Sequence, residues 1–153
     1  MRVPFSRSIM MIYQTVLVAV DVEKTDAELI KHAVEIARVF NADIYLAYVY
    51  PDKSHSFFSL ASWSQTYRDY YRRHKIDECS QDLAFIRSAY PIDKAHILTR
   101  GGQVVTELKQ IVEGINADLL IIGGHTRKAH LGGNLEQRIK TETPLDVLVV
   151  DYR

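Results

Sequence analysis

Glycines and polar residues gather in one stretch of the sequence, from residue 123 to residue 134. One glycine pair, 123–124, follows the apolar run 119–122, and a second pair, 132–133, precedes Asn134. Glycine backbone can approach a phosphate closely, and the free amides at the start of a helix capped by Asn can bind an anion. Basic residues lie between the two pairs: Arg127, Lys128 and His130. The stretch predicts a phosphate-binding loop, with a merely flexible loop as the alternative.

Asp21 directly follows another short apolar run, residues 15–20. A carboxylate in this position can accept a hydrogen bond from a ribose hydroxyl or an adenine amino group, or it can ligate a nucleotide-bound divalent ion. An ordinary turn aspartate is the alternative. Because ligands of open parallel sheets bind beyond the carboxyl ends of the strands, Asp21 and the 123–134 stretch are expected at one edge of the sheet.

The elements that must position these residues alternate between strands and helices. Short β-branched runs predict strands, and apolar residues spaced three and four apart predict helices. The predicted strands are 15–20, 44–50, 95–99, 119–122 and 147–150. The predicted helices run from an N-cap at Thr25 or Asp26 to a stop at Asn41, then over 66–89, 104–115 (after a turn at Gly101-Gly102) and 135–141. This alternation predicts an α/β, three-layer, doubly wound sandwich with a five-stranded parallel sheet.

Composition limits the classes of function. The 153 residues are 47% hydrophobic with zero net charge, which predicts one domain over residues 11–153 after an N-terminal extension, 1–10. The balanced charge argues against recruitment of nucleic acid or an anionic membrane, and no apolar stretch approaches the ~18 residues of a membrane span. Cys79, the single cysteine, fits a helix core and a reducing compartment. We therefore expect a cytoplasmic protein without nucleic-acid or membrane partners.

Three segments carry a family resemblance. The strand 16–21 with its terminal Asp, the strand that leads into Gly-x-His-x-Arg over 117–127, and the Pro-x-x-Val-Leu-Val-Val ending over 144–150 resemble universal stress proteins. The similarity extends over about residues 12–151. It implies the adenine nucleotide alpha hydrolase-like fold and an adenine-nucleotide ligand: ATP, ADP or AMP.

The phosphate loop departs from the pattern of the family's nucleotide-binding branch, Gly-x2-Gly-x9-Gly-[Ser/Thr]. Gly123 matches the first glycine, Thr126 stands at the second, and Gly133-Asn134 replaces the Gly-Ser pair after six residues (127–132) instead of nine. Non-glycine residues rarely adopt positive φ, so Thr126 is expected to disturb the amide cradle. The resemblance therefore implies a degenerate or weak site, whose predicted residues are Asp21, Val49, Gly123, Thr126, Arg127, Gly133 and Asn134.

The resulting hypothesis is a non-catalytic stress-response protein. No Ser/His/Asp order, activated cysteine or P-loop Gly-Lys-Ser/Thr is present, and no carboxylates accompany His125 and His130 at metal-site spacing. The last strand, with Val147, Leu148, Val149 and Val150, is an apolar edge that invites pairing into a homodimer, as in the family. The alternative is a genuine ATP-binding stress protein with slow ATP hydrolysis. A phospho-acceptor receiver domain is disfavoured because Thr99-Arg100 occupies the position of its acceptor acid.

Overall fold

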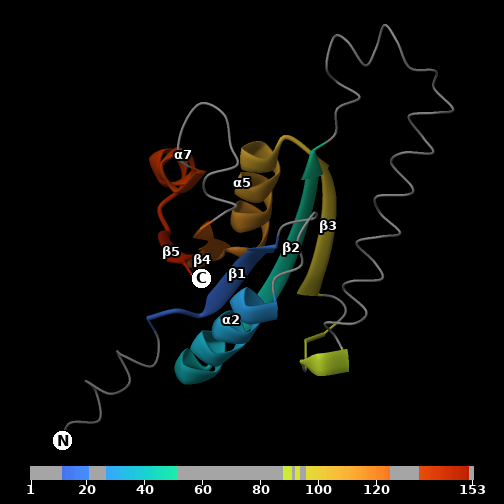
Figure 1. Ribbon diagram of the computed structural model, residues 1–153. Coiled ribbons are helices and arrows are strands. Elements are labelled where there is room, and N and C mark those ends of the chain that lie inside the picture. The colour runs from blue at the N-terminus through green and yellow to red at the C-terminus, as the bar shows by residue number, and fades with distance from the viewer. Residues whose placement is uncertain are drawn as a thin grey trace, which may run out of the picture.

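The computed structural model describes residues 12–20, 27–51, 88–90, 92–93, 96–124 and 135–151. The elements in chain order are β1 (Thr15–Val20), α2 (Ala27–Phe40), β2 (Asp43–Pro51), β3 (Ile97–Gly102), α5 (Val104–Ile115), β4 (Leu119–Gly123), α7 (Leu135–Glu142) and β5 (Asp146–Val150). Five strands form one sheet in the order β3-β2-β1-β4-β5, and every neighbouring pair is parallel (Figure 1). The predicted five-stranded parallel sheet is confirmed.

The two central strands, β1 and β4, are apolar along their whole length because helices cover both of their faces. Every residue of β4 is buried, as are all residues of β1 after Thr15. A strand with only one buried face would alternate apolar and polar side chains, which neither strand does. These continuous apolar runs are what made both strands predictable from the sequence.

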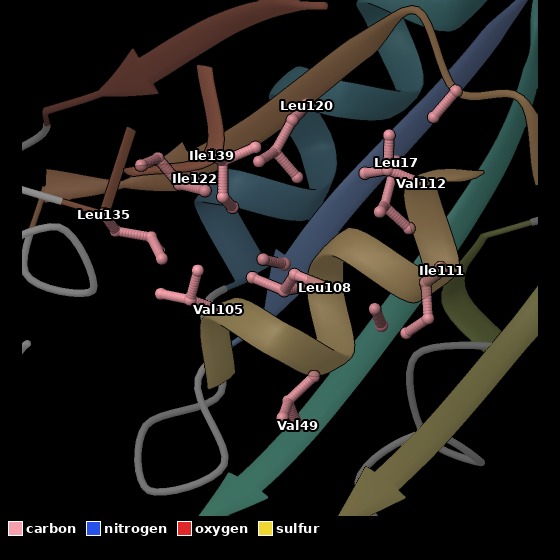
Figure 2. Close-up of a cluster of buried hydrophobic side chains, with 13 residues drawn as sticks. Leu17, Val49, Val105, Leu108, Ile111, Val112, Leu120, Ile122, Leu135 and Ile139 are labelled. Atoms are coloured by element: carbon pink, nitrogen blue, oxygen red, sulfur yellow. The ribbon is translucent and has the colours of Figure 1, made fainter. Parts of the chain in front are cut away.

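Successive strand residues point into two separate cores. On one face, α2 packs Leu29 and Ile30 against Val18 of β1. On the other, α5 and α7 cover residues such as Leu17 and Ile122, and Figure 2 shows the side chains of α5 directed at the strands. Figure 1 shows α2 on one side of the sheet and α5 with α7 on the other. Burial of each large aliphatic side chain contributes about 2 kcal/mol, so these three layers are held together mainly by apolar contact.

Asparagines in the left-handed conformation terminate two of the helices. Asn41 has a φ of 53°, and the amide of Ala42 donates to the carbonyl oxygen of Ala37 at 2.8 Å. Asn116 has a φ of 54° and its amide donates to Val112. Asparagine tolerates this conformation better than most residues, and the amide that follows can satisfy a carbonyl group of the last turn. The predicted stop of the first helix at Asn41 is confirmed.

The third strand differs from its prediction. It spans 97–102 rather than 95–99, and Gly101 and Gly102 are not a turn but the last strand residues, paired with Tyr50 and Pro51. The cause is nonlocal, because β2 continues to Pro51 and offers the glycines a partner. The chain turns afterwards at Gln103, and Gly102 has a φ of +151°, which side chains rarely allow. The predicted helix over 66–89 and the extension 1–10 fall largely or wholly outside the described residues.

At the amino end of the sheet, Asp118 ties the segment before β1 to β4. Its Oδ2 accepts the amide hydrogen of Gln14 at 2.9 Å, and its Oδ1 accepts that of Thr15 at 3.1 Å. The Asp118 carbonyl oxygen also accepts the amide hydrogen of Asp146 at 3.2 Å. A carboxylate that accepts two amide hydrogens is a strong, charge-assisted arrangement, so it fixes the register between these strands.

Candidate functional site

The strand order reverses between β1 and β4, which places a topological switch point at their carboxyl ends. From β1 the chain proceeds through β2 to β3 on one side, and then crosses to β4 and β5 on the other. Ala19 pairs with Ile122, so the next residues, Val20 and Gly123, end their strands at the same level. In doubly wound sheets ligands bind in the crevice beyond such a point. This edge is therefore the candidate site.

Of the predicted site residues, the structure places Val49 and Gly123 at this edge. Val49 lies near the carboxyl end of β2, on the side covered by α5, where it belongs to the same core cluster as Val105 (Figure 2). Gly123 is the buried last residue of β4 and pairs with Val150. The side chain of Val49 is only 6% exposed, so little of it is open to a ligand. Its place in the nucleotide site stays a prediction.

The other predicted site residues cannot be placed. Asp21, Thr126, Arg127, Gly133 and Asn134 all lie outside the described residues. Their neighbours are placed, however. Val20 ends β1 at the switch point, and Leu135, fully buried, begins α7.

Gly124 is a buried glycine with an acidic neighbour that the sequence did not reveal. A Cβ added to Gly124 would overlap Oδ1 of Asp151 and lie 2.8 Å from its Cγ. The carboxylate of Asp151 therefore rests directly against the Gly124 backbone, and any side chain at position 124 would displace it. This contact was hard to predict from the sequence, because the contact depends on the strand register that pairs Gly123 with Val150.

A second carboxylate covers a second glycine at the same edge. A Cβ on Gly102 would lie 2.8 Å from Oε1 of Glu107, in the first turn of α5. Gln103, at the N-cap position, makes no side-chain bond to the helix backbone; its Oε1 instead accepts a hydrogen bond of 2.8 Å from the hydroxyl of Thr106. An acidic residue in the first turn complements the positive end of the helix dipole. The positive amino end of α5 is therefore complemented by a carboxylate of the same helix, that of Glu107.

Two histidines of the described chain, His32 and His96, form hydrogen bonds to backbone carbonyl oxygens. Nδ1 of His32 donates to the carbonyl oxygen of Glu28 at 2.8 Å, and Nδ1 of His96 donates to that of Ile44 at 3.0 Å. His96 also stacks on Tyr45, with ring centroids 4.0 Å apart and planes 12° apart. Within the described ranges, no three or more His, Cys, Asp or Glu side chains are grouped so that they could hold a metal ion.

The geometry agrees with what comparison with known proteins shows. The sequence matches the Universal stress protein family over residues 12–151. The chain belongs to this family. No curated protein sequence matches the chain significantly. The family match covers the sheet, its helices and the switch point, so the resemblance seen in the sequence motifs is confirmed.

Solved structures of universal stress proteins share the fold. UspA from Lactobacillus plantarum is 20% identical to this chain with a TM-score of 0.60. The alignment covers 90% of this chain and 97% of that one. A universal stress protein in complex with cAMP is 22% identical to this chain with a TM-score of 0.53, and the alignment covers 91% of this chain and 97% of that one. At these identities the likeness establishes the fold, the adenine nucleotide alpha hydrolase-like sandwich, and leaves the ligand to be argued from the site.

Some structures of the same fold are longer than this chain. A universal-stress-type protein of Pseudomonas aeruginosa UCBPP-PA14 aligns over 90% of this chain at 19% identity and a TM-score of 0.61, but only 47% of its own length is covered. The chain therefore spans about half of that relative. Among the described helices of this universal stress protein, none is both long and apolar enough to cross a membrane.

Proposed function

We propose that this universal stress protein is a non-catalytic stress-response dimer that binds an adenine nucleotide weakly at the carboxyl edge between β1 and β4. The observation that carries the proposal is the switch point itself, where Val20 and Gly123 end neighbouring strands at one level. Asp21 follows the first of these residues in the sequence and the glycine-bearing loop follows the second. We therefore expect the acceptor and the amide donors to meet in one crevice.

A relative supports the class of ligand. The structure of a universal stress protein in complex with cAMP shows that a domain of this fold, 22% identical to this chain, holds an adenine nucleotide. The shortened loop between Thr126 and Gly133 argues for weak rather than tight binding of the phosphates. We therefore expect the adenine and the ribose to contribute most of the affinity.

The non-catalytic part of the proposal rests on what surrounds the glycines. The carboxylates placed at this edge, Glu107 and Asp151, both rest against glycine backbone. A nucleotide hydrolase needs a positioned water together with groups that stabilise charge on the phosphates, and two acidic side chains would oppose that charge. This arrangement does not support slow ATP hydrolysis, which the sequence left open as the alternative function.

The dimer part of the proposal rests on β5. In the described sheet β5 is an edge strand, paired with β4 alone, and each of its residues is half-buried or exposed. Leu148, the middle residue of β5, is 38% exposed. An unprotected apolar edge strand is a ready template for pairing with a second chain.

The cytoplasmic location stays a prediction.

Calorimetric titration tests the ligand proposal. We expect adenosine, AMP and cAMP to bind the full chain with dissociation constants between about 10 μM and 1 mM, corresponding to roughly 4 to 7 kcal/mol. Gly133→Val, which adds a branched side chain in the loop before α7, should weaken AMP more than adenosine, with circular dichroism showing an unchanged fold. If no adenine compound binds below about 1 mM, the ligand proposal is wrong and the dimer proposal stands alone.

A further inference from the structure

Asp146 places a carboxylate on the edge strand that the proposed dimer uses. It is the first residue of β5, and it is exposed. In the described sheet β5 pairs with β4 alone, so the other side of β5 is an open edge. A charge on an open edge opposes pairing with a second chain, because pairing would remove water from that charge. An unrestrained Asp146 would therefore work against the dimer.

Tyr13 restrains this carboxylate from the inner side of the sheet. Its phenol donates a hydrogen bond of 2.7 Å to Oδ2 of Asp146. Tyr13 precedes β1, and β4 lies between β1 and β5, so the hydrogen bond spans the amino end of β4. The ring of Tyr13 packs against the core on the α2 side of the sheet. The carboxylate of Asp146 is thus directed toward the middle of the sheet and away from the open edge.

A second carboxylate, that of Asp118, lies on the same inner side. Asp118 directly precedes β4, and its carbonyl oxygen accepts the amide hydrogen of Asp146 at 3.2 Å, so the two residues are neighbours. The pKa of Tyr13 is raised by the hydrogen bond to Asp146, by burial and by the charges of Asp146 and Asp118, which places both carboxylates near the phenol. Like charges repel at such short range. Removal of the phenol would leave this repulsion in place and free Asp146 to turn toward the open edge.

Resting on the proposed dimer, we propose that Tyr13 is a positioning residue for association: it keeps the charge of Asp146 off the strand edge through which a second copy of the chain pairs. A two-fold contact pairs an edge strand with itself in the antiparallel direction. With Leu148, the middle residue of β5, near the axis, the Tyr13–Asp146 pair occurs twice in the dimer, once at each end of the paired strands. A residue outside the paired strand thereby controls association.

The test measures dimerisation of the full chain by sedimentation velocity over about 1–100 μM protein, with circular dichroism to show an unchanged fold. We expect Tyr13→Phe to weaken the dimer about fivefold to tenfold, because each dimer loses the restraint twice. Asp146→Asn removes the charge but keeps an oxygen that accepts the hydrogen bond from Tyr13. In the Asp146→Asn background, Tyr13→Phe should therefore change the dissociation constant less than about twofold. If Tyr13 only braced the strand, the same loss would appear in both backgrounds, and that result would overturn the inference.

Tyr45→Phe is the matched control. It also removes one phenol hydroxyl, but Tyr45 lies on β2, on the far side of β1 from β5, where its ring stacks on His96. It should leave the dissociation constant of the dimer unchanged. If the wild type dimerises and Tyr13→Phe associates as tightly, this inference is overturned while the proposed dimer stands. If the wild type stays monomeric over the whole concentration range, the dimer part of the proposed function fails and the inference fails with it.

Discussion

The phenol of Tyr13 donates a hydrogen bond of 2.7 Å to Oδ2 of Asp146, which joins the approach to β1 with the first residue of β5. The hydrogen bond to Asp146 raises the pKa of Tyr13 above its ordinary value of 10.0, with further contributions from burial and from the charges of Asp146 and Asp118. Tyr13 also meets Phe40 edge-on, with ring centroids 5.0 Å apart. One side chain thus links the start of β1, the end of α2 and the start of β5.

This relationship predicts a loss of stability at alkaline pH. Because the folded pKa is above the unfolded one, the contribution of Tyr13 is complete below about pH 10 and is lost as the pH rises through the folded value. Tyr13→Phe should therefore be less stable than wild type near pH 8, and this difference should shrink near pH 11. Urea unfolding at both pH values measures it. In a double-mutant cycle with Asp146→Ala, a coupling that stays equal at both pH values would contradict the prediction.

The sequence was informative where structure depends on local signals or continuous burial. The runs 15–20 and 119–122 predicted β1 and β4, because strands covered on both faces have apolar residues at every position. Asn41 predicted the end of α2, because asparagine adopts the left-handed conformation readily. In contrast, these signals did not predict the order of the strands along the sheet.

What the sequence did not reveal depends on register between distant strands. Gly101-Gly102 resembled a turn, but β2 extends far enough to pair with both glycines, and their partners lie about fifty residues earlier. The stacking of His96 on Tyr45 and the contact of Asp151 with Gly124 arise in the same way. The predicted site residues came from the glycines and from Asp21 of the sequence and stay a prediction, whereas the carboxylates of Glu107 and Asp151 beside Gly102 and Gly124 emerged only from the three-dimensional structure.

Two glycines with different surroundings provide a sharp test of the Asp151 contact. Gly124→Ala places a Cβ on the carboxylate of Asp151, whereas Gly114, exposed in α5, has no atom within 4 Å of an added Cβ. We expect Gly124→Ala to lower the free energy of unfolding by about 1 kcal/mol and Gly114→Ala to raise it by about 0.5–1 kcal/mol. Thermal unfolding of both variants measures the two effects.

The cost at position 124 should depend on residue 151. If the carboxylate is the obstacle, Gly124→Ala should cost less in an Asp151→Ala background, with a coupling of about 0.5–1 kcal/mol. Equal costs in the two backgrounds would show that the Gly124 backbone itself, and not its acidic neighbour, resists substitution.

Thr143, just after α7, contains a buried polar atom that is not satisfied. The residue is 7% exposed and its Oγ1 has no hydrogen-bond partner in the described structure. A buried hydroxyl without a partner costs about 1–3 kcal/mol, so Thr143→Val, of nearly the same shape, should raise the free energy of unfolding by about 1 kcal/mol. Thr141→Val is the control. The Thr141 hydroxyl donates a 2.7 Å hydrogen bond to the carbonyl oxygen of Gln137, so this substitution removes a satisfied hydroxyl instead of an unsatisfied one. A destabilised Thr143→Val would reveal a partner for the hydroxyl in the rest of the chain.

The proposed dimer predicts opposite behaviour of two exposed apolar residues. Leu148 is 38% exposed on the edge strand β5, and Val39, on α2, is more exposed at 65%. A charge on an edge strand blocks pairing with a second chain, because the paired strands would bury it. Leu148→Asp should therefore convert a dimer at about 50 μM into a monomer, with at least a tenfold weaker association, while Val39→Asp leaves the dimer intact. Sedimentation velocity distinguishes these states. If exposure alone drove association, Val39→Asp would have the larger effect, and a wild-type monomer at this concentration would refute the pairing through β5.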